Sequence, residues 1–265
     1  MKALIDFDNQ FNEYMDSWAD ELLKKGKKAE EIEELIPEAY RKWAEEASKY
    51  FDDVEPLELV KMLGAYLDED IMVPDILIDK IVSEPLCEKG VYELFLEHRS
   101  DEERILLMNV LDDMNSKLPV NENINILLNS ENEELAQAAA EALKYSGAQD
   151  EILRVYEDEY DIDTKEKLMY VLVYSEPKVK GLAHKLTELM NVSQNRGIIA
   201  GMIAFYGDSS CLPILRIAEK SEEITYIDYV EICDAIESLG GETKREREFD
   251  GDEYYEMMHN GGFEG

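Results

Sequence analysis

Carboxylates are the side chains of this sequence with the most obvious chemical potential, because they are numerous and clustered. The densest cluster is Glu157–Asp163, and an oxygen-rich loop of this kind can bind Ca²⁺. An EF-hand loop, however, needs a glycine at its sixth position and a closing bidentate glutamate, and neither occurs here at the required spacing. Acidic pairs also arise by chance in so acidic a chain. We therefore expect no metal site.

The other residue types that commonly do chemistry are sparse. The three histidines are isolated from one another, with no pair at the spacing that a metal site on a helix requires. Cys87, Cys211 and Cys233 are odd in number and too far apart in sequence to suggest a zinc site. They are typical of free thiols in a reducing compartment, which predicts a cytoplasmic protein.

Known catalytic and cofactor-binding motifs do not occur in the sequence. It contains neither of the glycine-rich loops that bind phosphates or dinucleotides. It also lacks the nucleophile elbow of the α/β-hydrolases. We therefore expect a protein without a cofactor that is not an enzyme.

The charge balance narrows the class of partner. Asp and Glu number 62 against 27 Lys and Arg, which gives a formal net charge of −35, while 45% of the residues are hydrophobic. The apolar content predicts a folded chain, and the charge would repel nucleic acid and anionic membranes. No stretch approaches the roughly 20 apolar residues that cross a bilayer. Basic proteins or peptides are the partners that charge attraction favours. The alternative, that the acidity only maintains solubility, stays open.

The elements that would carry these charges are predicted to be helices throughout. Four apolar segments end in comparable turns at intervals of about 30 residues: 142–147, 171–176, 202–207 and 235–240. An apolar helix follows each of the first three. One unit is thus a helix, a tight turn and a helix, which buries its apolar face only by stacking on the next unit.

Local signals predict where individual helices start and stop. Ser130 and Asp163 each stand three residues before a glutamate, as the N-cap of a capping box does. Gly147, Gly207 and Gly240 are placed to close helices in a left-handed conformation.

The helix expected near residues 197–206 has an unusual composition. Small residues recur at helical spacing along one of its sides: Gly197, Ala200, Gly201 and Ala204. Small side chains let a neighbouring helix approach closely, which is the interpretation we favour. The alternative is that they leave room for a small ligand.

The segment 207–218, GDSSCLPILRIA, resembles the turn and first helix of HEAT-like repeats, in the short form known from phycobilin-lyase-type repeat proteins. The resemblance is good over 121–240, weaker over 56–115, and absent from 1–53. It implies an all-α fold, an α-α superhelix or solenoid. HEAT-like proteins serve as scaffolds, adaptors and occasionally enzymes, so the resemblance does not imply an activity.

We expect the chain to have three parts. Residues 1–53 are expected to form an N-terminal helical cap, 54–240 the repeat solenoid, and 241–265 a C-terminal tail or end-cap. The alternative for the tail is a docking segment that folds on binding or lies back in the acidic groove, since it contains basic and aromatic residues.

Aligning the repeats predicts the residues of the inner, concave surface of the superhelix. These positions lie opposite the apolar side of each helix, and most are acidic or amide side chains: Glu134, Gln137, Glu141, Asp163, Glu166, Tyr170, Gln194 and Asp234. DNA glycosylases of the HEAT-like class need a basic groove instead. We therefore expect a scaffold that binds a basic protein or peptide on this surface. Two alternatives are an acidic decoy that imitates nucleic acid and, less favoured, a repeat-based enzyme.

Overall fold

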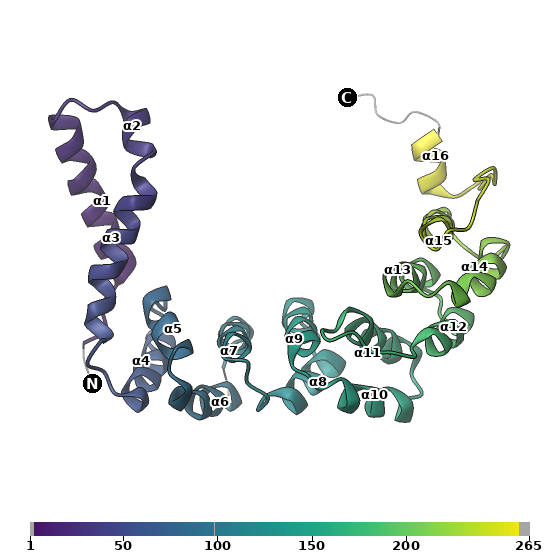
Figure 1. Ribbon diagram of the computed structural model, residues 1–265, viewed down its shortest axis with the longest axis horizontal. Coiled ribbons are helices and arrows are strands. Elements are labelled where there is room, and N and C mark those ends of the chain that lie inside the picture. Colours follow the sequence, from purple (N-terminus) through teal and green to yellow (C-terminus); the bar gives the residue numbers. More distant parts are fainter. Residues whose placement is uncertain (1–2, 98, 260–265) are drawn as a thin grey trace. The chain divides into compact units, whose positions relative to one another are not determined.

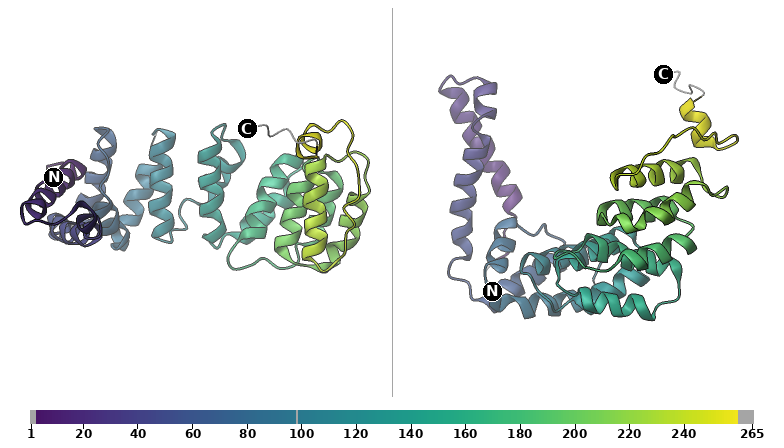
Figure 2. Two further views of the ribbon diagram at one scale, coloured as in Figure 1. Left: turned by 90° about the horizontal axis from the view of Figure 1, so that it is seen from above. Right: turned by 45° about the vertical axis from the view of Figure 1, so that its right-hand side comes forward.

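The protein is all-helical over the part that the computed structural model describes, residues 3–97 and 99–259 (Figures 1 and 2). Sixteen α-helices and three short 3-10 helices occur in these residues, and no strand does. The expectation of an all-α fold is confirmed. The chain divides into two compact units, unit 1 (residues 1–121) and unit 2 (residues 122–265), which are described separately. No helix among the described residues is long and apolar enough to cross a membrane.

Unit 1 is a succession of helices, each of which packs on helices one or two places away in sequence. α1 contacts α2 and α3, α3 contacts α5, α4 contacts α5 and α6, and α7 contacts α5 and α6. The helices are α1 (Phe7–Lys24), α2 (Ala29–Glu33), α3 (Ile36–Ser48), α4 (Pro56–Asp68), α5 (Asp75–Val82), α6 (Glu88–Leu96) and α7 (Asp101–Asp113). Short 3-10 turns lie at Lys49–Phe51 and Pro85–Cys87.

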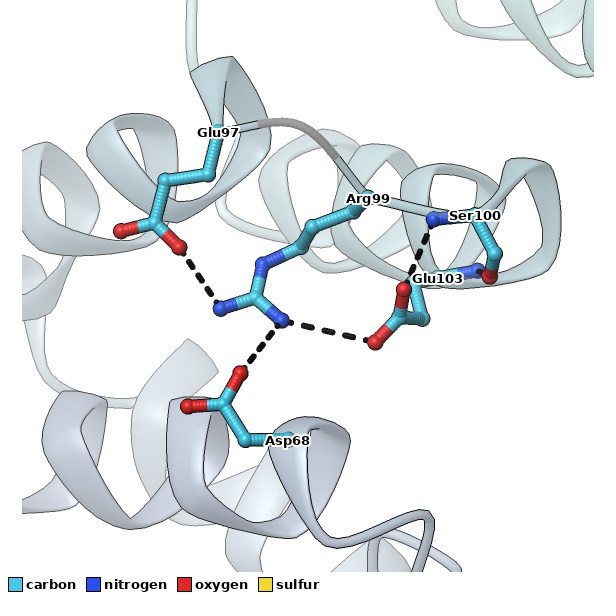
Figure 3. A network of polar contacts seen from close by, with 5 residues as sticks. All are labelled: Asp68, Glu97, Arg99, Ser100 and Glu103. Carbon is cyan, nitrogen blue, oxygen red and sulfur yellow. Dashed lines mark hydrogen bonds and ion pairs between the residues drawn. The ribbon is translucent and has the colours of Figure 1, made fainter.

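A buried arginine connects three helices of unit 1 (Figure 3). Arg99 lies between α6 and α7, and only 6% of its side chain is exposed. Its guanidinium group donates to Asp68 at the end of α4 (3.1 Å), to Glu97 just after α6 (2.8 Å) and to Glu103 in α7 (3.4 Å). Glu103 also accepts from the backbone N–H of Ser100, which caps α7. One cation thus neutralises carboxylates from three elements.

Unit 2 consists of two sets of helices that alternate along the chain. α8 (Val120–Asn129) crosses the boundary between the units, and the rest are α9 (Glu133–Tyr145), α10 (Gln149–Asp158), α11 (Ile162–Tyr174), α12 (Ala183–Val192), α13 (Arg196–Tyr206), α14 (Leu212–Glu219), α15 (Tyr226–Ser238) and α16 (Glu253–His259). In one set α9, α11, α13 and α15 contact each other in that order (Figure 1). In the other, α10 packs on α11, α12 on α11 and α13, and α14 on α12 and α15.

The glycines predicted to end helices do so. Gly207 follows α13 with φ of +80° and donates its N–H to the carbonyl of Ile203, and Gly240 has φ of +83°. The left-handed conformation is inexpensive only for glycine, so these positions fix where the turns fall.

Two predicted N-caps were wrong. α9 begins at Glu133, and its N-cap is Asn132 rather than Ser130. The Asn132 side chain accepts from the backbone N–H groups of Glu134 and Leu135. α11 begins at Ile162, so its N-cap is Asp161, and Asp163 lies inside the first turn. In both cases a second capping residue stood nearby in the sequence, and where the helix starts decided between them.

The side of α13 that carries the small residues has two different surroundings. A Cβ on Gly197 would lie 2.8 Å from Asp228 Oδ1 and 3.2 Å from Asp228 Cα in α15, and the Gly197 N–H donates to that carboxylate at 2.8 Å. This is the close helix approach that the sequence predicts. A Cβ on Gly201, one turn later, would meet nothing within 4 Å. The small side of α13 is therefore packed at its beginning and open in its middle.

The described part of the tail, residues 241–259, packs on the last helices of unit 2. Phe249 is buried against the rings of Tyr226 and Tyr229. Arg247 donates to the backbone carbonyls of Glu219 (3.2 Å) and Ser221 (2.7 Å). The last six residues of the predicted tail lie outside the described residues.

Candidate functional site

An acidic pocket lies in unit 2 between α9, α11 and α13. It has a volume of about 680 Å³. Its lining, which defines the acidic pocket, comes from these helices, the end of α8 and the loops before α9 and α13: Leu127, Ser130, Glu131, Glu133, Ala136, Gln137, Ala140, Asp163, Glu166, Lys167, Tyr170, Asn195, Ile198 and Met202. All of it belongs to unit 2, so one compact body positions the whole site.

Four of the eight residues predicted to bind a partner line this pocket. They are Gln137 of α9 and Asp163, Glu166 and Tyr170 of α11. Helical geometry explains why the three from α11 share one side, since they are spaced three and four residues apart. Gln137 joins them because α9 packs against α11.

Glu166 is the most unusual of these residues. The prediction placed it on an open surface, but only 8% of it is exposed. One carboxylate oxygen, Oε2, accepts a hydrogen bond of 2.7 Å from the Asn195 side chain, while Oε1 has no partner. A buried acceptor without a donor is costly in free energy, and such groups are rare in folded proteins. Glu166 therefore holds an unused hydrogen-bond acceptor, Oε1, which is covered in this structure.

The charges around the pocket are mostly negative. Glu131, Glu133, Asp163 and Glu166 contribute four carboxylates, against one cation, Lys167. Lys167 donates to the backbone carbonyl of Leu127 at 3.5 Å.

Apolar side chains form the other part of the lining. Ala140 and Met202 are buried, and Ile198 is 59% exposed although it is a large apolar residue. A pocket with apolar walls and carboxylates around it suits a ligand that has an apolar stem and a cationic end.

A buried lysine that the sequence did not predict adds a positive charge next to the pocket. Lys144 is 6% exposed, and its Nζ donates to Glu141 Oε1 (2.6 Å) and to the Tyr170 hydroxyl (3.2 Å). The same Nζ lies 4.4 Å from the centre of the Tyr170 ring. Burial lowers the pKa of Lys144, but the hydrogen bonds to Glu141 and Tyr170 outweigh burial, so its pKa lies above the usual value.

Glu141 is consequently neutralised within the chain. Its Oε1 also accepts from Gln137 Nε2 at 2.8 Å. Of the predicted carboxylates, Glu141 is thus one whose charge is already balanced by a buried partner.

An aromatic row extends from Tyr170 away from the pocket. Tyr170 and Tyr174 have ring centres 4.8 Å apart, and Tyr174 and Phe205 of α13 are separated by 4.3 Å. Lys178 Nζ lies 5.1 Å from the centre of the Phe205 ring. Phe205 is 48% exposed, so the end of this row lies at the surface.

The remaining predicted residues are not brought to the pocket. Glu134 and Gln194 are exposed and do not line it, although their neighbours Glu133 and Asn195 do. Asp234 in α15 makes an ion pair with Arg245 from the tail, which also bonds Glu237 at 2.7 Å. These two carboxylates hold the pKa of Arg245 above its usual value, the hydrogen bond to Glu237 being the larger cause.

No protein-family model, curated protein or solved structure matches this chain.

Proposed function

We propose that this protein is a non-enzymatic scaffold or adaptor, and that unit 2 binds a basic segment of a partner protein at the acidic pocket. The observation that carries the proposal is Glu166, a buried carboxylate with an unused oxygen in a pocket that has four carboxylates and one cation. A cationic side chain would satisfy this acceptor and gain a charge-assisted hydrogen bond.

We further propose that unit 2 is a HEAT-like solenoid and that the acidic pocket lies on its concave surface. The order of contacts supports this, because α9, α11, α13 and α15 each pack on the next while the alternate helices pack behind them. Repeats that contact only their neighbours leave one continuous face of helices, and solenoid proteins use such faces to bind extended segments.

The chain itself contains an example of the proposed interaction. The basic segment Lys244–Arg247 lies against α15, where Arg245 pairs with Asp234 and Glu237. A basic residue of the chain thus already pairs with carboxylates of the helix set that forms the pocket.

The test is the binding of a fluorescein-labelled peptide in which lysine alternates with glycine, followed by fluorescence anisotropy at physiological salt. The test variant combines Glu131→Gln, Glu133→Gln and Asp163→Asn, all exposed carboxylates of the pocket. Each exposed ion pair contributes up to about 1 kcal/mol, so the dissociation constant should rise by about tenfold or more.

The matched control removes the same amount of charge outside the pocket. Asp158→Asn, Glu188→Gln and Glu222→Gln are exposed residues of unit 2 that do not line it. The control should change the dissociation constant less than about twofold, because only diffuse attraction is reduced. Equal weakening in both variants would mean that the peptide senses net charge alone, and the proposal would be wrong.

A further inference from the structure

We infer that the acidic pocket holds a single lysine side chain of the partner, with its ammonium group on Glu166. The inference rests on the proposed function and specifies which basic residue the pocket selects. It starts from the hydrogen bonds of Glu166, whose Oε2 is occupied by Asn195 and whose Oε1 is free.

The free acceptor favours an ammonium over a guanidinium group. Arginine binds a carboxylate best through two parallel hydrogen bonds, which require both oxygens. Because Asn195 uses one oxygen of Glu166, a bidentate pair cannot form without displacing it. An ammonium group needs only one oxygen, and it can turn its other donors toward further acceptors in the lining.

The apolar part of the lining suits the rest of a lysine side chain. Ala136, Ala140, Ile198 and Met202 offer short or apolar groups along which a four-carbon stem can lie. The open space beside Gly201 continues the same side of α13, since a Cβ there would meet nothing within 4 Å. The pocket thus combines an apolar wall with a buried carboxylate that has one unpaired oxygen.

Access to this acceptor defines the one movement that binding requires. Glu166 Oε1 is covered in the unbound protein. Asn195 holds the other oxygen of the same carboxylate, so we assign the opening of the path to a rotation of the Glu166 side chain that keeps this hydrogen bond.

The experiment compares two peptides that differ only in their basic residue, one with lysine and one with arginine alternating with glycine. Arginine usually forms the stronger contacts with surface carboxylates. The inference predicts that the lysine peptide binds the wild-type protein more tightly by about tenfold, the value of one hydrogen bond to a charged group. It also predicts that Glu166→Gln abolishes this preference, whereas the equally charged control Glu188→Gln retains it.

A second variant guards against a folding defect in Glu166→Gln. Ala136→Leu fills the pocket from a partly exposed position without changing any charge. It should weaken the lysine peptide by about tenfold and leave the arginine peptide within about twofold.

The outcomes separate the inference from the proposed function. If neither peptide binds, the proposed function fails. If both bind with equal affinity, or if Glu166→Gln and Ala136→Leu leave the lysine preference intact, the lysine pocket is overturned while the proposed function survives.

Discussion

Alanine substitutions at the two glycines of α13 should change the stability of unit 2 in opposite directions. Gly197 and Gly201 lie one turn apart in the same helix, and each substitution adds the same methyl group. Their surroundings differ, because α15 lies against Gly197 whereas Gly201 faces open space. The pair therefore tests the packing of α13 on α15 with the chemistry held constant.

The expected magnitudes follow from these surroundings. At Gly201 the added Cβ meets nothing within 4 Å, so alanine gains its advantage in helix propensity, about 0.5–1 kcal/mol. At Gly197 the Cβ would lie 3.2 Å from a backbone atom of Asp228, which cannot rotate away. Overpacking of this kind costs about 1–3 kcal/mol, which exceeds the propensity gain. We expect a net loss of about 1–2 kcal/mol.

Urea unfolding followed by two probes measures both effects. Far-ultraviolet circular dichroism reports on the helices of both units. Trp18 and Trp43 both belong to unit 1, so their fluorescence provides an internal control in the same sample. Gly201→Ala should raise the midpoint of the circular dichroism transition for unit 2 and Gly197→Ala should lower it, with the fluorescence transition unchanged.

One result would refute the reasoning. If Gly197→Ala is neutral or stabilising, the close approach of α13 and α15 at Gly197 is wrong. The close contact between Gly197 and Asp228 could then no longer support the predicted stacking of repeated helices.

Three further predictions concern buried polar groups. Arg99→Met should lower the free energy of unfolding of unit 1 by about 2–3 kcal/mol, because three carboxylates lose their shared cation. The loss stays below the largest values for buried ion pairs because these carboxylates are partly exposed. Tryptophan fluorescence in urea measures this free energy. Lys89→Met, which breaks an exposed pair, should change it by less than about 0.5 kcal/mol, and equal effects would contradict the role of Arg99. Burial raises the pKa of Cys87 to about 11 and raises the pKa of Cys211 and Cys233, so none should react with a thiol reagent at mildly alkaline pH until urea unfolds the chain; rapid labelling of the native protein would count against their burial. Since the unfolded thiols ionise first, stability should also fall as the pH rises from about 9, the ordinary value, toward 11.

Local signals in the sequence predicted the features that depend on a few adjacent residues. Gly207 and Gly240 mark helix ends because the left-handed backbone conformation is a property of a single position. Asp163, Glu166 and Tyr170, which the helical phase of α11 groups together, all line the acidic pocket.

Features that depend on distant parts of the chain were not predicted. Nothing local indicates that Lys144 would be buried beside Tyr170, which is 26 residues away, or that Asp234 would pair with Arg245. Asn195 was missed by one position, because aligning repeats by their glycines does not fix the register of the preceding loop. The burial of Glu166 likewise depends on how α9, α11 and α13 meet, and this is a property of the packed unit.

The ion pairs of Arg245 limit how far a bound partner segment can extend along unit 2. Since this arginine already pairs with Asp234 and Glu237, these two carboxylates of α15 are not free to bind a partner. A longer partner segment that used these two carboxylates would first have to displace Arg245 of the protein's own C-terminal tail. The length of partner segment that unit 2 can bind would then depend on competition between the tail and the partner for Asp234 and Glu237.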